Sequence, residues 1–163
     1  ILEDEETIVQ FPRFFTVYGP YGRPDMSILR FVHWVFNNDD VIVYGNGEQK
    51  RSFTFISDIV NGLNRLLDYN KSGTFNLGSN QTWSLNEIIN LIEKKLNSKA
   101  KIVYKDRAMK DVDIVLPSLE RSNKLLDWEP KISIKDGLDL TIEWYLKYQE
   151  ELSEIGFKYK YEE

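Results

Sequence analysis

Short runs of β-branched and aromatic residues alternate along the chain with longer stretches in which apolar residues recur three or four positions apart. The short runs predict extended segments, which fall at 7–17, 41–44, 51–55, 74–77, 102–104 and 112–115. The longer stretches predict helices, which fall at 28–36, 59–67, 85–96, 118–126 and 134–148. Short strands between about five helices indicate the α/β fold class, as one small mixed α/β domain.

Small polar residues stand where these helices are expected to begin. The segments 84–87 and 133–136 each place a serine three residues before an acidic residue, a pattern typical of a capping box. Asp25 precedes the first apolar helix, and Ser57 or Asp58 precedes the second. Their side-chain oxygens can accept from the unpaired amides of a first turn, so we expect N-caps at these positions.

Glycine and proline mark two connections. Residues 19–24 predict a rigid loop between an extended segment and a helix, and residues 45–47 read Gly-Asn-Gly, which predicts a turn between two strands of a hairpin. Arg23 stands beside the helix start, where backbone amides and a guanidinium suit a phosphate or carboxylate. The alternative is an ordinary strand–loop–helix connection with a surface arginine.

Composition narrows the classes of function. The chain has 163 residues, of which 42% are hydrophobic, and this is ample for the core of one domain. Its formal net charge of −5 argues against a general nucleic-acid or anionic-membrane surface, and no apolar run approaches the roughly 20 residues of a membrane span. The absence of cysteine excludes disulfides and thiolate metal sites. It is compatible with a reducing cytosol, and we expect a cytoplasmic protein.

Residues 13–26 read RFFTVYGPYGRPDM, and residues 43–58 read VYGNGEQKRSFTFISD. These two segments resemble the substrate-binding segments of the extended short-chain dehydrogenase/reductases, the NAD-dependent epimerase/dehydratase family. The first is most similar to the corresponding stretch of UDP-glucuronate 4-epimerases. The resemblance implies that Phe14 lies near the nicotinamide, that Thr16 donates to the sugar, and that Arg23 lies near the sugar or the diphosphate.

The second segment implies a nucleotide contact. The resemblance assigns Ile42 and Tyr44 to the strand that offers backbone groups and an aromatic face to uracil, and Arg51 to the arginine that pairs with the diphosphate. A guanidinium held on a strand is a good bidentate partner for phosphate. For Tyr44 the alternative is ordinary strand packing. Asp58 is interpreted as a helix cap rather than as a catalytic acid.

A third stretch, residues 107–130, matches the family less closely. Asp111 matches the aspartate that binds the ribose in the family, but Ala108 stands where an arginine or glutamine is usual. Arg107 or Lys110 could supply the missing charge, and Arg107 is the preferred candidate. Residues 117–118 read Pro-Ser where the family has Ala-Asp, which weakens the transfer of fine substrate specificity.

The motifs of redox chemistry are absent from this sequence. It has no Gly-x-Gly-x-x-Gly after a predicted strand and no Tyr-x-x-x-Lys, the pair that supplies the family's general base. The resemblance covers 11–149, so we expect the nucleotide-sugar-binding C-terminal domain of an epimerase, without its Rossmann half and inactive in isolation. Residues 1–10 are an uncertain boundary segment and residues 150–163 a charged tail. NAD is implied for the full-length parent, and we expect no bound cofactor, catalytic residue or metal in this chain.

The resemblance implies partners and leaves alternatives open. The partners are a UDP-sugar, of the UDP-glucuronate or UDP-glucose type, and the Rossmann domain. Exposed Phe14 and Phe15 would form an apolar patch that favours self-association. The alternatives are a fragment of a nucleotide-sugar decarboxylase or 4,6-dehydratase, and a non-enzymatic binding or assembly module. His33, on an apolar helix, is interpreted as a structural residue.

Overall fold

The computed structural model of the chain describes residues 7–106, 112–154 and 157, and it confirms the mixed α/β architecture. The strands within these residues are β1 (Gln10–Phe14), β2 (Thr16–Tyr18), β3 (Asp40–Tyr44), β4 (Lys50–Arg51), β5 (Phe53–Phe55), β6 (Gly73–Leu77), β7 (Trp83–Ser84), β8 (Lys101–Lys105) and β9 (Ile114–Val115). The helices within them are α1 (Ser27–Asn37), α2 (Ile56–Asp68), α3 (Leu85–Leu96), α4 (Glu120–Leu126), α5 (Ile134–Lys147) and α6 (Gln149–Ser153). No helix among the described residues is long and apolar enough to cross a membrane.

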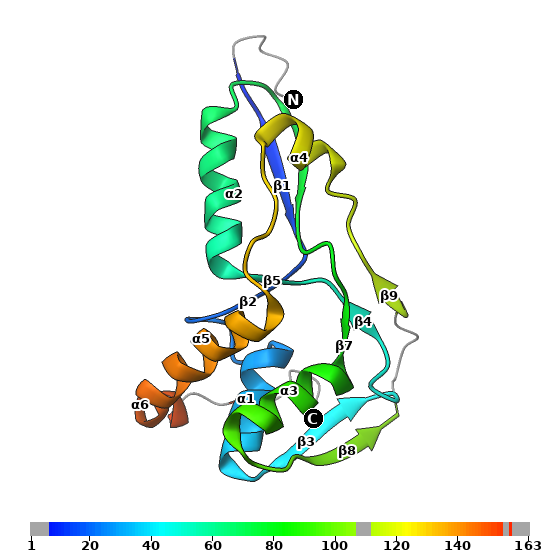
Figure 1. Cartoon of the computed structure of the whole chain (residues 1–163), viewed down its shortest axis with the longest axis vertical. Helices are drawn as coiled ribbons and strands as arrows, with labels where there is room; N and C mark the ends of the chain where they lie inside the picture. Colours follow the sequence, from blue (N-terminus) through cyan, green and yellow to red (C-terminus); the bar gives the residue numbers. More distant parts are fainter. Residues whose placement is uncertain (1–6, 107–111, 155–156, 158–163) are drawn as a thin grey trace.

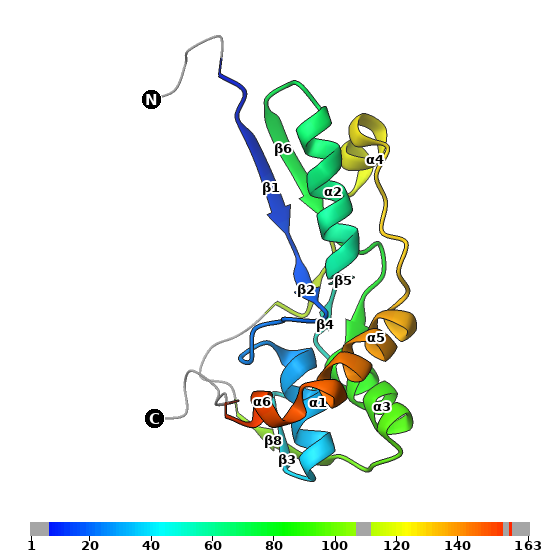
Figure 2. The same cartoon turned by 90° about the vertical axis from the view of Figure 1, so that its left-hand side faces the viewer.

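The molecule is elongated and has two lobes (Figure 1). In one lobe, here called the β1–β6 lobe, parallel strands β1 and β6 lie beside α2 and α4 (Figure 2). In the other, the β3–β8 lobe, parallel strands β3 and β8 lie beside α1, α3 and α5. The short parallel pair β2–β5 and the three-stranded sheet β7–β4–β9 lie between the lobes. Each lobe has its own buried apolar cluster, so the fold does not depend on one central sheet.

The core of the β1–β6 lobe forms because α2 is amphipathic. Its residues Ile59 and Leu66 are buried against Phe75 and Leu77 of β6. Trp128, fully buried beside them, donates its indole N–H to a carbonyl oxygen of α2 at 3.0 Å. The polar atom of this large side chain is therefore satisfied, as burial requires.

The capping box predicted at 84–87 is confirmed. The Ser84 hydroxyl accepts from the Glu87 amide at 3.1 Å, and the Ser84 amide donates to the Glu87 carboxylate at 2.7 Å. Ser133 accepts from the Asp136 amide at 3.2 Å and caps α5, but the Asp136 carboxylate accepts from the Ser133 hydroxyl and not from its amide, so the box predicted at 133–136 is only half formed. Both caps succeed as predictions because they involve residues only three positions apart.

The predicted caps of the other two long helices are wrong. The N-cap of α1 is Met26, which makes no side-chain cap bond, because Asp25 is engaged by Arg23 instead. Helix α2 already begins at Ile56, so Asp58 lies in its first turn. The Asp58 carboxylate accepts from the Ile132 amide at 2.9 Å, which agrees with a structural rather than a catalytic role.

The hairpin predicted around residues 45–47 is also wrong. Gly45 and Gly47 have φ of 81° and 77°, so the chain turns there as expected. However, β3 pairs in parallel with β8, whereas β4 pairs with β7 and β9. The turn therefore directs the chain from one sheet into another instead of folding β4 back on β3.

The single extended segment predicted at 7–17 and the charged tail predicted at 150–163 are both more structured than expected. The extended segment 7–17 divides into β1 and β2, which pair with β6 and β5 respectively. The tail begins with α6, in which Leu152 is buried. Phe157 is also buried and stacks on His33 with 3.8 Å between ring centroids. His33 bonds to the Tyr145 hydroxyl at 2.9 Å, as its structural interpretation requires.

Candidate functional site

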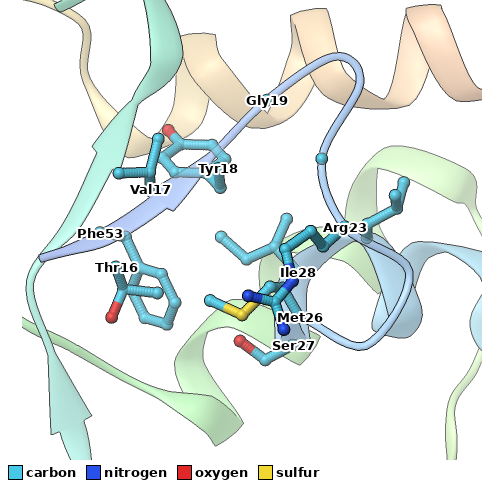
Figure 3. Close-up of a pocket in the computed structure, with 11 residues that line it drawn as sticks. Thr16, Val17, Tyr18, Gly19, Arg23, Met26, Ser27, Ile28 and Phe53 are labelled. Carbon is cyan, nitrogen blue, oxygen red and sulfur yellow. The ribbon is translucent and has the colours of Figure 1, made fainter. Parts of the chain in front are cut away.

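Thr16 and Arg23, which are seven residues apart in the sequence, lie on the same small hollow. Thr16 is half-buried on β2, and the hollow is completed by the glycine loop, the start of α1 and Phe53 of β5. Figure 3 shows the side chains of Thr16, Ser27 and Arg23 around it. Its volume is about 10 Å³, room for about one water. The hollow that the described residues form here is therefore too small to enclose a ligand larger than water.

Arg23 already has an anionic partner. Its Nε donates to Asp25 Oδ1 at 2.9 Å and its Nη2 to Asp25 Oδ2 at 2.5 Å, and 74% of its side chain is exposed. The hydrogen bond from Arg23 lowers the pKa of Asp25, and the same bond raises the pKa of Arg23. An anionic ligand at Arg23 would have to compete with this bidentate contact.

Ile42 and Tyr44 lie on the same face of β3 and are both half-buried, because side chains two positions apart share a face of a strand. Just beyond Tyr44, the Gly45 amide donates to the Lys105 carbonyl at 2.8 Å. At this point an open hollow of about 310 Å³ is lined by Gly45, Asn46, Tyr104, Lys105 and Asp106. Sequence reasoning missed the β8 residues, since only the β3–β8 pairing brings them to this turn.

Asn86 of α3 holds the glycine turn in place. Its amide nitrogen donates to the Asn46 carbonyl at 3.0 Å and to the Glu48 carboxylate at 2.6 Å. A Cβ at Gly47 would overlap the Asn86 side chain, and the positive φ of Gly47 also favours glycine. The glycine turn that follows β3 is therefore packed against and bonded to α3.

Arg51 lies at the centre of the sheet between the lobes. It is half-buried on β4, whose neighbours are β7 and β9, and its Nη1 donates to the Lys50 carbonyl at 2.8 Å. The next residue, Ser52, accepts from the Thr16 amide at 3.1 Å and donates to the Val115 carbonyl at 3.1 Å. The strands that carry Thr16 and Arg51 are thus joined backbone to backbone.

Of the remaining predicted site residues, Phe14 lies at neither hollow, and two lie outside the described residues. Phe14 ends β1, and 49% of it is exposed. Its neighbour Phe15 donates its amide to the Leu77 carbonyl at 3.3 Å. Arg107 and Asp111 lie outside the residues that the structure describes.

Apart from Arg23 and Asp25, the side chains with clearly shifted pKa values are Tyr18, Tyr145 and His33, and of these Tyr18 also lines the hollow beside Thr16. Burial, and secondarily the Asp58 and Asp136 charges, raises the pKa of Tyr18. Burial also raises the pKa of Tyr145 and lowers the pKa of His33. No cluster of potential metal ligands occurs among residues 7–106, 112–154 and 157.

Known proteins match most of the chain. A family model described as GDP-mannose 4,6 dehydratase matches residues 3–141. A UDP-glucuronate 4-epimerase of Thermodesulfobacterium geofontis is 41% identical over 133 residues, covering 81% of this chain and 41% of the relative. UDP-glucuronic acid decarboxylase 4 of Arabidopsis thaliana is 33% identical over 136 residues, covering 82% of this chain and 31% of the relative.

A solved structure gives the same result in three dimensions. The UDP-glucuronic acid 4-epimerase of Bacillus cereus, crystallised with UDP-glucuronic acid and NAD, superposes with a TM-score of 0.79 at 27% identity. The match covers 83% of this chain and 44% of that protein, so the chain spans less than half the length of these relatives. By sequence and by fold, the chain belongs to the NAD-dependent epimerase/dehydratase family, which includes nucleotide-sugar epimerases, decarboxylases and dehydratases.

Proposed function

We propose that this chain is the UDP-sugar-binding part of a nucleotide-sugar epimerase, most similar to UDP-glucuronate 4-epimerase. The observation that carries the proposal is the backbone junction at Ser52, which joins the strand of Thr16 to the strand of Arg51. The family resemblance assigns the first residue to the sugar and the second to the diphosphate. Because sugar and diphosphate are adjacent in a nucleotide sugar, the two side chains that bind them must lie on adjacent elements.

In this proposal the nucleotide end of the ligand occupies the hollow beyond Tyr44 at the end of β3. Its volume of about 310 Å³ and its open rim, formed by Gly45 and Tyr104 among others, suit an extended ligand. In the proposal Ile42 and Tyr44 contact the uracil, while Arg107 and Asp111 bind the phosphate and ribose. Arg23 then exchanges Asp25 for an anionic group of the ligand.

The motifs that are present and absent indicate which steps this chain would perform and which it would leave to the Rossmann half. NAD would supply hydride transfer in the full-length enzyme, and the resemblance assigns only Phe14 of this chain to the neighbourhood of the nicotinamide. This sequence has no Tyr-x-x-x-Lys and no glycine-rich dinucleotide motif. We therefore infer that the chain binds and orients the UDP-sugar, and that the Rossmann half is its partner in turnover.

A decarboxylase or dehydratase parent is the second candidate. The Arabidopsis relative named as a UDP-glucuronic acid decarboxylase is 33% identical. A decarboxylase would need the same kind of nucleotide-binding residues. A non-enzymatic binding module would bind the nucleotide sugar without converting it. Incubating the chain with NAD and UDP-glucuronate tests the expectation of inactivity, because measurable turnover would contradict the proposed division of labour.

Titration with UDP, followed by amide chemical shifts, tests the binding site itself. We expect saturable shifts at Thr16, Gly45 and Tyr104, with micromolar to millimolar affinity. Arg51→Gln should weaken UDP binding about tenfold or more, because the phosphates lose their guanidinium partner. Uridine has no phosphates, so its binding should be nearly unchanged. Arg65→Gln is the matched control, since Arg65 lies on α2 and pairs with Asp127 at the end of α4. A folded chain that shows no shifts at several millimolar UDP would refute the proposal.

A further inference from the structure

One side chain, Asn86 of α3, bonds to both walls of the hollow beyond Tyr44. Its side-chain nitrogen donates to the Asn46 carbonyl at 3.0 Å and to the Glu48 carboxylate at 2.6 Å, on the turn that follows β3. Its side-chain oxygen accepts from the Tyr104 hydroxyl at 3.2 Å, on β8. Asn46 and Tyr104 both line the hollow. Asn86 therefore joins the turn and β8 through one amide group.

The backbone of α3 strengthens this connection. Asn86 is the second residue of α3, a position whose amide has no partner within the helix. This amide donates to the Gly47 carbonyl at 3.2 Å, so the turn satisfies an N–H group that the helix leaves unpaired. The Asn86 side chain is half-buried, and both its nitrogen and its oxygen are used in the bonds described above. These bonds hold the side chain in one orientation.

The turn itself has internal bonds that do not involve Asn86. The Glu48 amide donates to the Asn46 side-chain oxygen at 3.0 Å, and the Gln49 side chain donates to the Tyr44 carbonyl at 3.2 Å. Both bonds lie within residues 44–49 and close the turn on itself. What Asn86 adds is the placement of this turn beside β8. Loss of the Asn86 side chain should therefore loosen the hollow without unfolding the chain.

This placement matters because the β3–β8 pairing ends at the hollow. Its last pair is Tyr44 with Lys105, and the Gly45 amide donates to the Lys105 carbonyl at 2.8 Å. Asn46 and Asp106 line the hollow beyond that last pair. The bonds of Asn86 continue the connection between the two walls from the point where the strand pairing ends.

We propose that Asn86 is a positioning residue for the nucleotide end of the ligand, and that it acts by holding Tyr104 and the glycine turn at a fixed separation. This inference rests on the proposed function, which puts the nucleoside in this hollow. The bond to its hydroxyl restricts the Tyr104 ring, and a ring that is already placed loses less conformational entropy when a ligand packs against it. Because the effect acts on the nucleoside, uridine and UDP should depend on Asn86 alike.

Asn86→Ala tests the proposal, with Asn90→Ala as its matched control. Asn90 is an exposed asparagine one turn further along α3. Asn86→Ala should weaken uridine and UDP binding by the same factor, about five- to tenfold, because both ligands contain the nucleoside. Arg51→Gln, in contrast, should weaken UDP binding alone. Asn90→Ala should bind both ligands as tightly as the parent chain.

Tyr104→Phe separates positioning from a general effect on stability. It removes only the hydroxyl that is bonded to Asn86 and keeps the aromatic ring that lines the hollow. Uridine binding should weaken about two- to fivefold. Asn86→Ala combined with Tyr104→Phe should bind uridine no more weakly than Asn86→Ala alone. If the two factors multiply in the double variant, the side chains act independently and the proposal is overturned.

Hydrogen exchange without ligand separates this inference from the proposed function. The Gly45 amide, which is bonded to the Lys105 carbonyl, should exchange about fivefold faster in Asn86→Ala and at the parent rate in Asn90→Ala. Unchanged exchange in Asn86→Ala would overturn the claim that Asn86 joins the walls, whether or not nucleotides bind. A parent chain that does not bind UDP would refute the proposed function. If the parent chain binds UDP and Asn86→Ala binds uridine equally tightly, the positioning role alone is overturned.

Discussion

Replacing Gly137 by alanine tests how closely α5 must approach β2, the strand that carries Thr16. Gly137 lies inside α5, directly over the side chain of Tyr18. A Cβ added there would overlap the Tyr18 hydroxyl and would lie 2.8 Å from its Cζ and 2.9 Å from Phe55 Cδ2. Real Cβ atoms do not approach other carbon atoms so closely, so one of the neighbours must move.

Two opposing effects decide the sign of the change. Alanine in place of glycine inside a helix stabilises by about 1 kcal/mol, whereas overpacking a core destabilises by about 1–3 kcal/mol. Tyr18 cannot easily move aside, because it is 6% exposed and packs edge-on against Phe55 at 5.5 Å and Phe53 at 6.4 Å. We therefore take the upper end of the overpacking range and expect a net loss of about 2 kcal/mol in the free energy of unfolding.

Urea unfolding followed by tryptophan fluorescence measures this loss, and a double-mutant cycle locates it. Tyr18→Phe removes the overlapping hydroxyl, whose own bond to the Ile134 carbonyl is long at 3.5 Å. Gly137→Ala combined with Tyr18→Phe should therefore be less destabilised than the two single losses predict by addition. An alanine variant as stable as the parent chain would refute the packing argument, and a strictly additive cycle would show that the strain lies elsewhere.

Two further predictions concern the capping box and the single histidine. Ser84→Ala should lower the free energy of unfolding by about 1 kcal/mol. Ser57→Ala should change it by less than about 0.5 kcal/mol, because Ser57 makes no cap bond. Equal losses for the two variants in urea unfolding would contradict this prediction. Burial lowers the pKa of His33 in the folded chain, so the unfolded chain binds the proton more readily. Stability should be complete above about pH 6.5 and should fall as the pH drops below it. His33→Gln should flatten that dependence, and an NMR pKa of His33 above about 6.5 would disprove it.

Local signals in the sequence were sufficient for much of the fold. The cap of α3 needs only Ser84 and Glu87, which are one helical turn apart, and the chain there has no competing partner. The same reasoning failed at Asp25, because a bidentate partner two residues away, Arg23, took the carboxylate from the helix amides. A local pattern is decisive only where no stronger neighbour competes for the same atoms.

Strand partners were outside the reach of local patterns. The glycines at 45 and 47 turn the chain as their sequence predicts, but the turn does not determine what β3 pairs with. Its partner β8 begins at Lys101, and a parallel pair requires a long crossover connection between the two strands. The hollow beyond Tyr44 exists only because of that pairing.

The sequence by itself therefore determined the family, the helices and the segments that resemble a nucleotide-sugar grip, because these depend on residues that are close along the chain. Only the tertiary structure decided which of those segments meet, since parallel pairing and lobe packing join positions many tens of residues apart. The hollow beyond Tyr44 is the clearest case. Gly45 and Tyr104 have no shared motif in the sequence, and they line one hollow because β3 pairs in parallel with β8.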